Sequence, residues 1–174
     1  MQIYSYQSMK PQLAGNNFIA PSAILIGELI IGENVNIWFN SVIRADVNKI
    51  IIGKNTNVQD LCMLHVTAEN DLQIGENVTI GHSVILHGCQ IGEGCLIGMG
   101  AKVLDGAVIG KNSLVAAGAV VPPGKVYPAN SLIMGVPAIV KKELDSKTRD
   151  QISNHYKSYL GYAKIYQTQE FKPV

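Results

Sequence analysis

A large aliphatic side chain recurs at every sixth residue over most of this chain. The repeated positions are Ile19, Leu25, Ile31, Ile37, Ile43, Ile52, Val58, Leu64, Ile74, Ile80, Leu86, Ile91, Ile97, Val103, Ile109, Val115 and Val121. A smaller residue precedes many of them by two positions, and glycine directly follows many of them. A period of six fits neither the 3.6-residue repeat of an amphipathic helix nor the simple alternation of a hairpin.

This pattern predicts a parallel β-helix. Two inward side chains spaced by two positions make a short strand, and a turn follows, in which we expect glycine to supply an unusual φ angle. Three strands per coil give a triangular prism with about 18 residues per turn and coils roughly 4.8 Å apart. Cys62, Cys89 and Cys95 occupy the small inward slot, so we expect them to fill the core rather than to bind metal or act in redox chemistry.

The pattern changes after Val121. We expect the repeat to end at residues 122–124 and residues 127–138 to close the last coil. Asp145 or Ser146 can then cap an amphipathic helix that packs along the outside of the prism and covers its open end. Apolar side chains recur at helical spacing at Ile152, Tyr156, Tyr159, Leu160, Ala163 and Tyr166.

The six-residue step is broken in three places. The breaks directly follow Ile43, Leu64 and Leu86. Three strands separate each break from the next, so all three lie on one edge of a three-sided prism. The residues that follow these aliphatics are Arg44, His65 and His87, and the alternation of a strand points them outward. We therefore expect a column of Arg44, His65 and His87 on the outer surface, one residue per coil.

The same count places Asp60 and His82 on the preceding face, stacked on one another, with Gln59 beside them. Two histidines about 4.8 Å apart can bind one ion, because metal–nitrogen distances are about 2.0–2.1 Å. His82 lies one side of the triangle away and can reach that ion only from a different chain. We infer a homotrimer with three interface metal sites, each using His65 and His87 of one chain and His82 of its neighbour. Three neutral imidazoles with one open position are typical of catalytic zinc, whose bound water becomes hydroxide near neutral pH.

Simpler interpretations apply to single residues. One outward histidine on such a strand is more often a solvated polar side chain, and only the matched phase of three histidines favours a metal site. Arg44 with Asp46 can be a surface ion pair of small energetic value, and Asp60 can accept a hydrogen bond from Arg44 across chains. We expect Arg44, Asp46 and Asp60 to stabilise the interface. Gln59 is the better candidate to hold a metal-bound water, because an amide both donates and accepts. Trp38 is expected to pack between chains.

Composition narrows the class of protein. The 174 residues carry a formal net charge of +1 with 16% charged residues, which excludes a strongly basic nucleic-acid surface. The sequence has no signal-like N-terminal segment and no apolar run of about 18 residues, so we expect a soluble, cytoplasmic protein. We expect a hexapeptide-repeat β-helix domain over residues 1–140 and a C-terminal helix and tail over residues 141–174.

Four segments of this sequence resemble the γ-class carbonic anhydrases, and more closely the bacterial γ-carbonic-anhydrase-like hexapeptide proteins. The matching segments are Ile43-Arg44-Ala45-Asp46, Asn57-Val58-Gln59-Asp60, Met63-Leu64-His65-Val66-Thr67 and Ile80-Gly81-His82-Ser83-Val84-Ile85-Leu86-His87-Gly88-Cys89. The likeness extends from about Ile19 to Ala138. The hexapeptide repeat is shared with many acyltransferases, whereas the Arg-x-Asp, Gln-Asp and three-histidine set is specific to this family.

The resemblance implies an all-β fold, a left-handed β-helix, although the usual right-handed crossover rule favours the other hand. It implies a trimer that holds zinc, or alternatively iron or cobalt, on His65, His82 and His87. It also implies reversible hydration of carbon dioxide to bicarbonate by a metal-bound hydroxide. In that reaction Gln59 would orient the hydroxide, while Arg44 and Asp46 would hold the interface.

One departure bears on activity. Active members of the family carry a glutamate directly after the Arg-x-Asp triplet and acidic residues in an extended loop after the first histidine, which move protons away. This chain has Val47 at the first position and a short loop at residues 67–71, where Glu69 or Asp71 can substitute. Without a proton path, regeneration of the hydroxide is expected to be slow.

Three functions stay open from the sequence. The first is a metal-dependent carbonic anhydrase. The second is a hexapeptide acyltransferase or related acyl-thioester enzyme, which needs a catalytic histidine outside the metal site, and only His155 is available. The third is a metal-stabilised trimer with little or no turnover. His155 is expected on the surface of the C-terminal helix, where Tyr159 can line a pocket.

Overall fold

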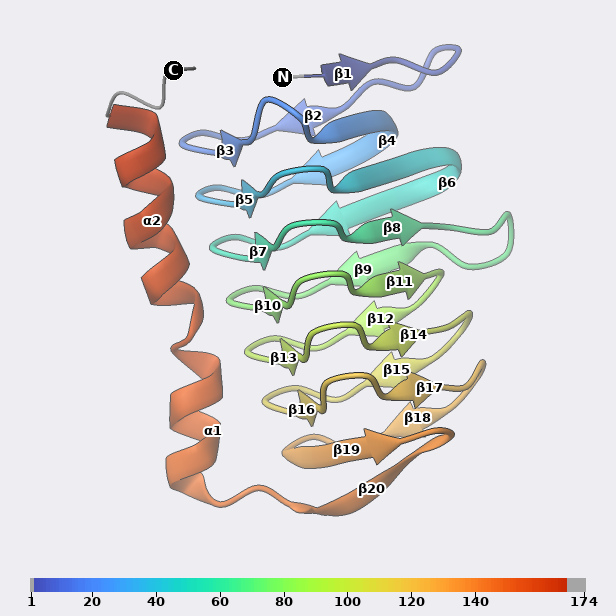
Figure 1. The fold of residues 1–174 in the computed structure, drawn as a ribbon. Coiled ribbons are helices and arrows are strands. Elements are labelled where there is room, and N and C mark those ends of the chain that lie inside the picture. The colour runs from blue at the N-terminus through green and yellow to red at the C-terminus, as the bar shows by residue number, and fades with distance from the viewer. Residues whose placement is uncertain (1, 169–174) are drawn as a thin grey trace.

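The chain winds into a left-handed parallel β-helix with its C-terminal helix packed along one side (Figure 1), which confirms the predicted fold class. The computed structural model describes residues 2–168. The face beneath the helix, here the helix face, contains β3 (Phe18–Ile19), β5 (Asn36–Ile37), β7 (Asn57–Val58), β10 (Thr79–Ile80), β13 (Leu96–Ile97), β16 (Leu114–Val115) and β19 (Ser131–Gly135).

The other two faces join into one sheet because two long strands run around the edge between them. The second face contains β1 (Gln2–Tyr4), the first halves of β4 (Ile24–Ile31) and β6 (Val42–Ile52), β8 (Met63–His65), β11 (Ile85–His87), β14 (Lys102–Val103) and β17 (Val120–Val121). The third face contains β2 (Gln12–Leu13), the second halves of β4 and β6, β9 (Leu72–Ile74), β12 (Gln90–Ile91), β15 (Val108–Ile109) and β18 (Val126–Tyr127).

The register confirms the count of three strands per coil. Ile43 is paired with Leu64, and Leu64 with Leu86, while Val58 is paired with Ile80 on the helix face. These aliphatic side chains are fully buried inside the prism. The interior ladders are therefore the hydrophobic core, and the residue after each ladder position points outward.

The coils continue beyond both predicted limits. Leu13 pairs with Ile31 before the first predicted strand, and Tyr127 and Ile133 stack on the last ladders with side chains that are almost completely buried. The predicted end of the repeat at residues 122–124 was therefore wrong. Tyr127 occupies an inward slot, which a search for aliphatic residues alone does not detect. An antiparallel pair of β19 with β20 (Ala138–Glu143) closes that end of the prism.

Glycine follows the aliphatic ladder positions for a different reason from the one expected. Gly32, Gly53, Gly75, Gly92 and Gly110 are not among the residues of positive φ. A Cβ atom built on any of them would lie 2.4–2.8 Å from backbone atoms of the next coil. These positions require glycine because consecutive coils approach closely at this edge. The expectation of an unusual φ angle was wrong there.

The substitution Gly75→Ala is expected to lower the free energy of unfolding by about 1–3 kcal/mol, because backbone atoms cannot move aside as a flexible side chain can. Gly118 is the matched control, since it has φ +68° and no atom within 4 Å of a built Cβ. Asparagine tolerates this left-handed conformation, so Gly118→Asn should change stability by less than about 1 kcal/mol. Denaturant titration measures both variants, and equal losses would contradict the close-approach explanation.

The C-terminal helix consists of α1 (Ser146–Ser153) and α2 (Tyr156–Thr168), separated by a turn at Asn154 and His155. As predicted, Asp145 caps it, and its carboxylate accepts a 2.7 Å hydrogen bond from the Thr148 N–H. No helix among residues 2–168 is long and apolar enough to cross a membrane.

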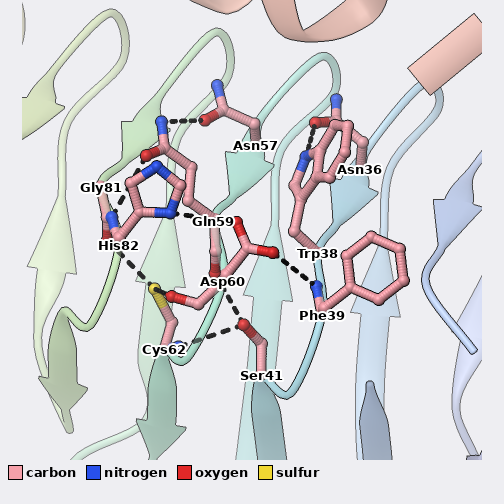
Figure 2. Close-up of polar contacts among 10 residues, drawn as sticks. All are labelled: Asn36, Trp38, Phe39, Ser41, Asn57, Gln59, Asp60, Cys62, Gly81 and His82. Carbon is pink, nitrogen blue, oxygen red and sulfur yellow. Dashed lines mark hydrogen bonds and ion pairs between the residues drawn. The ribbon is translucent and has the colours of Figure 1, made fainter. Parts of the chain in front are cut away.

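Trp38 is buried beneath α2 of its own chain, so its assignment to packing between chains was wrong. Its ring centroid lies 5.7 Å from that of Tyr159 and 5.2 Å from that of Tyr166, both in edge-on arrangements. Its Nε1–H donates a 2.8 Å hydrogen bond to Asn36 Oδ1 (Figure 2). These aromatic contacts fix α2 against the helix face.

The three cysteines are buried in the prism, as predicted, and burial raises the pKa of each thiol to about 12. At pH 8 about one native thiol in ten thousand is therefore ionised, against about one in ten at the ordinary value of 9.0. We expect Ellman's reagent to modify none of them rapidly until the protein unfolds. The pKa of these thiols is higher in the folded protein than in the unfolded protein. The free energy of unfolding should therefore fall as pH rises from about 9 towards 12. Rapid native labelling of any cysteine would contradict this prediction.

Candidate metal centre

His65 and His87 lie side by side on the second face, on consecutive coils. Residues of β8 and β11 pair in register, which places the two imidazole centroids 5.0 Å apart. Nδ1 of His65 lies 2.9 Å from Nε2 of His87. The predicted column of histidines is therefore present within one chain.

Each ring of this pair has a carboxylate on its opposite side. Asp46 Oδ1 lies 3.1 Å from Nε2 of His65, and Asp105 Oδ1 contacts Nδ1 of His87. An ionised carboxylate can only accept, so in each ring the nitrogen that faces it carries the proton. In the neutral imidazoles the remaining nitrogens then point their lone pairs at one another. Two converging lone pairs are the arrangement expected of two ligands to one cation.

Burial favours the neutral form of His65. It lowers the pKa of His65 below its ordinary value, and the hydrogen bond with Asp46 opposes this shift without cancelling it. Burial also acts to raise the pKa of Asp46, but hydrogen bonds from Arg44 and His65 outweigh it, so the pKa lies below its usual value. The Arg44 guanidinium pairs with Asp46 in the same chain. The predicted Arg44–Asp46 pair thus holds His65 in place.

His82 lies in the turn after β10 and next to Asp60 (Figure 2). Its Nδ1 is 3.0 Å from Asp60 Oδ2, so a carboxylate holds this histidine too and leaves Nε2 free. The backbone N–H of His82 donates a 3.2 Å hydrogen bond to Gln59 Oε1. The predicted stacking of His82 on Asp60, with Gln59 beside them, is confirmed.

Gln59 is almost completely buried, and both ends of its amide have partners (Figure 2). Nε2 donates a 3.2 Å hydrogen bond to Asn57 Oδ1, and Asn57 in turn donates to Thr79 Oγ1 at 2.9 Å. An amide has two N–H groups and two acceptor lone pairs, so one of each remains for a further ligand. Asn57 was not singled out from the sequence, although it lies two residues before Gln59 on the same strand face.

A groove of about 520 Å³ opens beside His82, between the helix face and the C-terminal helix. Its walls are mostly apolar and include Met99, and Tyr159 and His155 border it from the helix. As predicted, Tyr159 lines a pocket, where burial, and then the charge of Asp60, raises its pKa. His155 faces this groove as well as the surface, with its ring centroid 5.9 Å from that of Tyr159.

Asp105 was missed in the sequence. It follows Val103, which is paired with Leu86 one coil before it. The stacking count that placed His65 and His87 at one phase puts Leu104, not Asp105, at that phase, so spacing by itself did not indicate this contact.

Residues 2–168 of one chain do not bring three metal ligands together. Among the described residues, no group of three or more His, Cys, Asp or Glu side chains is arranged to hold a metal ion. His65 and His87 nevertheless fit two adjacent positions of a zinc site, because imidazole nitrogen is a preferred zinc ligand and carboxylates hold both rings. A zinc ion bound to this pair would need a third ligand from outside the described residues of this chain.

Comparison with known proteins identifies the family of the chain. A family model described as bacterial transferase hexapeptide (six repeats) matches residues 71–103 and 88–123. The chain is 44% identical to a carbonic anhydrase of Geobacillus kaustophilus over 170 residues, which cover 96% of this chain and 93% of that protein. It is 38% identical to the mitochondrial gamma carbonic anhydrase 2 of Arabidopsis thaliana over 161 residues, 89% of this chain and 58% of that protein.

A solved structure is similarly close. A hexapeptide transferase family protein of Anaplasma phagocytophilum is 35% identical, with a TM-score of 0.91 over 95% of this chain and 98% of that one. The fold is therefore shared by proteins with carbonic anhydrase and transferase names. High identity over nearly the full length of a carbonic anhydrase decides the family. The chain belongs to the γ-class carbonic anhydrase-like family of hexapeptide-repeat proteins.

Proposed function

We propose that this protein hydrates carbon dioxide reversibly to bicarbonate at metal sites shared between the subunits of a homotrimer. His65 and His87 of one chain and His82 of the next would hold zinc, with iron or cobalt as alternatives. The observation that carries the proposal is that a carboxylate holds one nitrogen of each histidine, while the free nitrogens of His65 and His87 converge at 2.9 Å. Metal-ligating histidines commonly have such carboxylate partners.

The second face is suited to contact with a neighbouring copy. Its outward side chains form an apolar column of Ile24, Val42, Met63 and Ile85, which are paired in register and half-buried. At the equivalent height the third face presents Ile30, Ile51, Gln73 and Gln90, so its outward column is only partly apolar. The helix face is covered by its own helix. The uninterrupted apolar column of the second face favours a subunit interface there. Packing at this face would bring His82 of one chain towards the histidine pair of another.

The residues of this chain would supply the remaining functions. Zinc on three neutral imidazoles lowers the pKa of a coordinated water to about 7 and so supplies a nucleophile near neutral pH. Gln59 has one N–H and one lone pair left to orient a bound water or substrate oxygen. Asp46, held by Arg44, keeps the His65 ring in place. Hydration also releases a proton, and Glu69 and Asp71 on the loop after β8 are the acidic candidates to carry it away.

Metal analysis combined with a hydration assay tests this function. The protein would be purified without oxygen, its metal content measured, and its carbon dioxide hydration followed by stopped flow with a pH indicator. We expect one metal ion per chain and hydration above the buffer background. A fully metal-loaded trimer without hydration would overturn the carbonic anhydrase proposal and favour a metal-stabilised trimer without turnover.

An acyl-thioester enzyme is the second candidate, because the groove beside His82 is far larger than carbon dioxide requires. The groove is about 520 Å³ and mostly apolar, and it is bordered by His155, which has no part in the metal site. If this candidate is correct, the protein should cleave or transfer acyl groups from acyl-thioesters, and His155→Ala should abolish that activity. Stoichiometric metal together with carbon dioxide hydration, and no thioester turnover, would count against it.

A further inference from the structure

Asp105 lies at the corner after β14, one coil beyond His87, and its position is fixed by backbone hydrogen bonds on both sides. The carbonyl oxygen of Asp105 accepts a 2.8 Å bond from the Gly124 N–H, and the Gly106 N–H donates a 2.6 Å bond to Gly88 O. From this corner Oδ1 contacts Nδ1 of His87. The carboxylate is therefore presented to His87 by a rigid part of the β-helix.

Gly88, directly after His87, leaves room for this carboxylate. A Cβ atom on Gly88 would lie 3.2 Å from Asp105 Oδ1 and 2.9 Å from Cβ of Asn70, and the residue has φ +50°. Any larger side chain would crowd the contact between Asp105 and His87. Glycine at position 88 therefore leaves room for the Asp105 carboxylate against Nδ1 of His87.

The contact determines which nitrogen of His87 can bind a metal. A carboxylate at Nδ1 stabilises the ring with its proton on Nδ1, so the lone pair is on Nε2, which faces Nδ1 of His65. In the other ring the two nitrogens exchange roles, because Asp46 holds Nε2 of His65 and leaves Nδ1 free. The two carboxylates hold the histidine pair from its two ends.

We propose that Asp105 is a positioning residue, which sets the tautomer and orientation of His87 and so makes it a metal ligand. This inference rests on the proposed metal site and adds to it a residue that does not itself touch the metal. The alternative is a surface ion pair without influence on the metal, since the Asp105 side chain is 41% exposed and exposed pairs contribute little to stability.

Zinc affinity separates the two roles. Competition with a chelator of known affinity should show that Asp105→Ala weakens zinc binding by about 10- to 100-fold. Asp105→Asn keeps an acceptor but loses the charge. Its zinc affinity should lie between that of Asp105→Ala and that of the unaltered protein. Asp150→Asn on α1 removes the same charge away from the histidines and should bind zinc as the unaltered protein does. Unchanged zinc affinity in Asp105→Ala would overturn the inference.

The tautomer of His87 supplies a second readout, which needs no metal. Long-range ¹⁵N–¹H spectra of the zinc-free protein should show the His87 proton on Nδ1, and Asp105→Ala should shift it towards a mixture of tautomers. A purely structural role would lower the melting temperature and leave the tautomer unchanged, which would contradict the inference. If the unaltered protein binds no zinc, the proposed function fails, and the tautomer measurement still decides whether Asp105 positions His87.

Discussion

Mixing His82→Ala chains with His65→Ala chains should restore metal sites that neither variant forms alone. A shared site takes His65 and His87 from one chain and His82 from the next. In a mixed trimer, one interface joins a chain with an intact histidine pair to a chain with an intact His82. If equal amounts are refolded together and assemble at random, about three quarters of the trimers are mixed and about one quarter of all sites are intact. Metal content and hydration rate should recover to that fraction.

The matched control for this experiment is a mixture of His65→Ala and His87→Ala chains. Both changes affect the pair that one chain must supply, and no chain in the mixture retains both histidines. The mixture should therefore stay without metal at every ratio. Recovery in this control, or stoichiometric zinc in His82→Ala by itself, would show that the sites are not divided between chains in the proposed way.

Ile85→Lys should separate the subunits and abolish metal binding while every histidine remains in place. Ile85 is in the apolar column of the second face, and its register neighbour Lys102 already places one ammonium group there. A second lysine would have to bury an unpaired charge between subunits and would be repelled by Lys102, which opposes association. Sedimentation should show monomers, and metal analysis should show almost no bound zinc.

Gln90→Lys is the control for Ile85→Lys, because Gln90 is exposed on the third face, away from the proposed interface. It adds the same charge and should remain trimeric and metal-loaded. Circular dichroism should show an intact β-helix in both variants, since both side chains point away from the prism. A trimeric, zinc-loaded Ile85→Lys protein would show that the second face is not the subunit interface.

The positions of the histidines could be predicted because a β-helix converts sequence spacing into spatial position. With three strands in each coil, residues at equal phase stack directly, so His65 and His87 had to be neighbours, and so did Asp60 and His82. The same rule predicted the buried cysteines. The homotrimer, the metal and the roles of Gln59, Arg44, Asp46 and Asp60 stay predictions, because a single chain holds neither the neighbouring subunit nor the ion.

Other features required the three-dimensional structure. Trp38 has the phase of an outward residue in the repeat, and only the docking of α2 decides that it is buried within its own chain. The ladder glycines could be recognised as special, yet the distance between coils, rather than φ, proved to be the reason. The contact of Asp105 with His87 depends on a side-chain direction at a corner, which spacing does not specify.

The sequence by itself determined the prism, its core ladders and the phase of the three histidines, because the six-residue period allows one way to bury the aliphatic side chains. Only the tertiary structure decided how the rings are oriented. Carboxylates from different coils select the nitrogen that each histidine leaves free, and this selection depends on hydrogen bonds over a few ångströms. The convergence of the free nitrogens of His65 and His87 thus depends on tertiary contacts between residues that the repeat stacks along one edge of the prism.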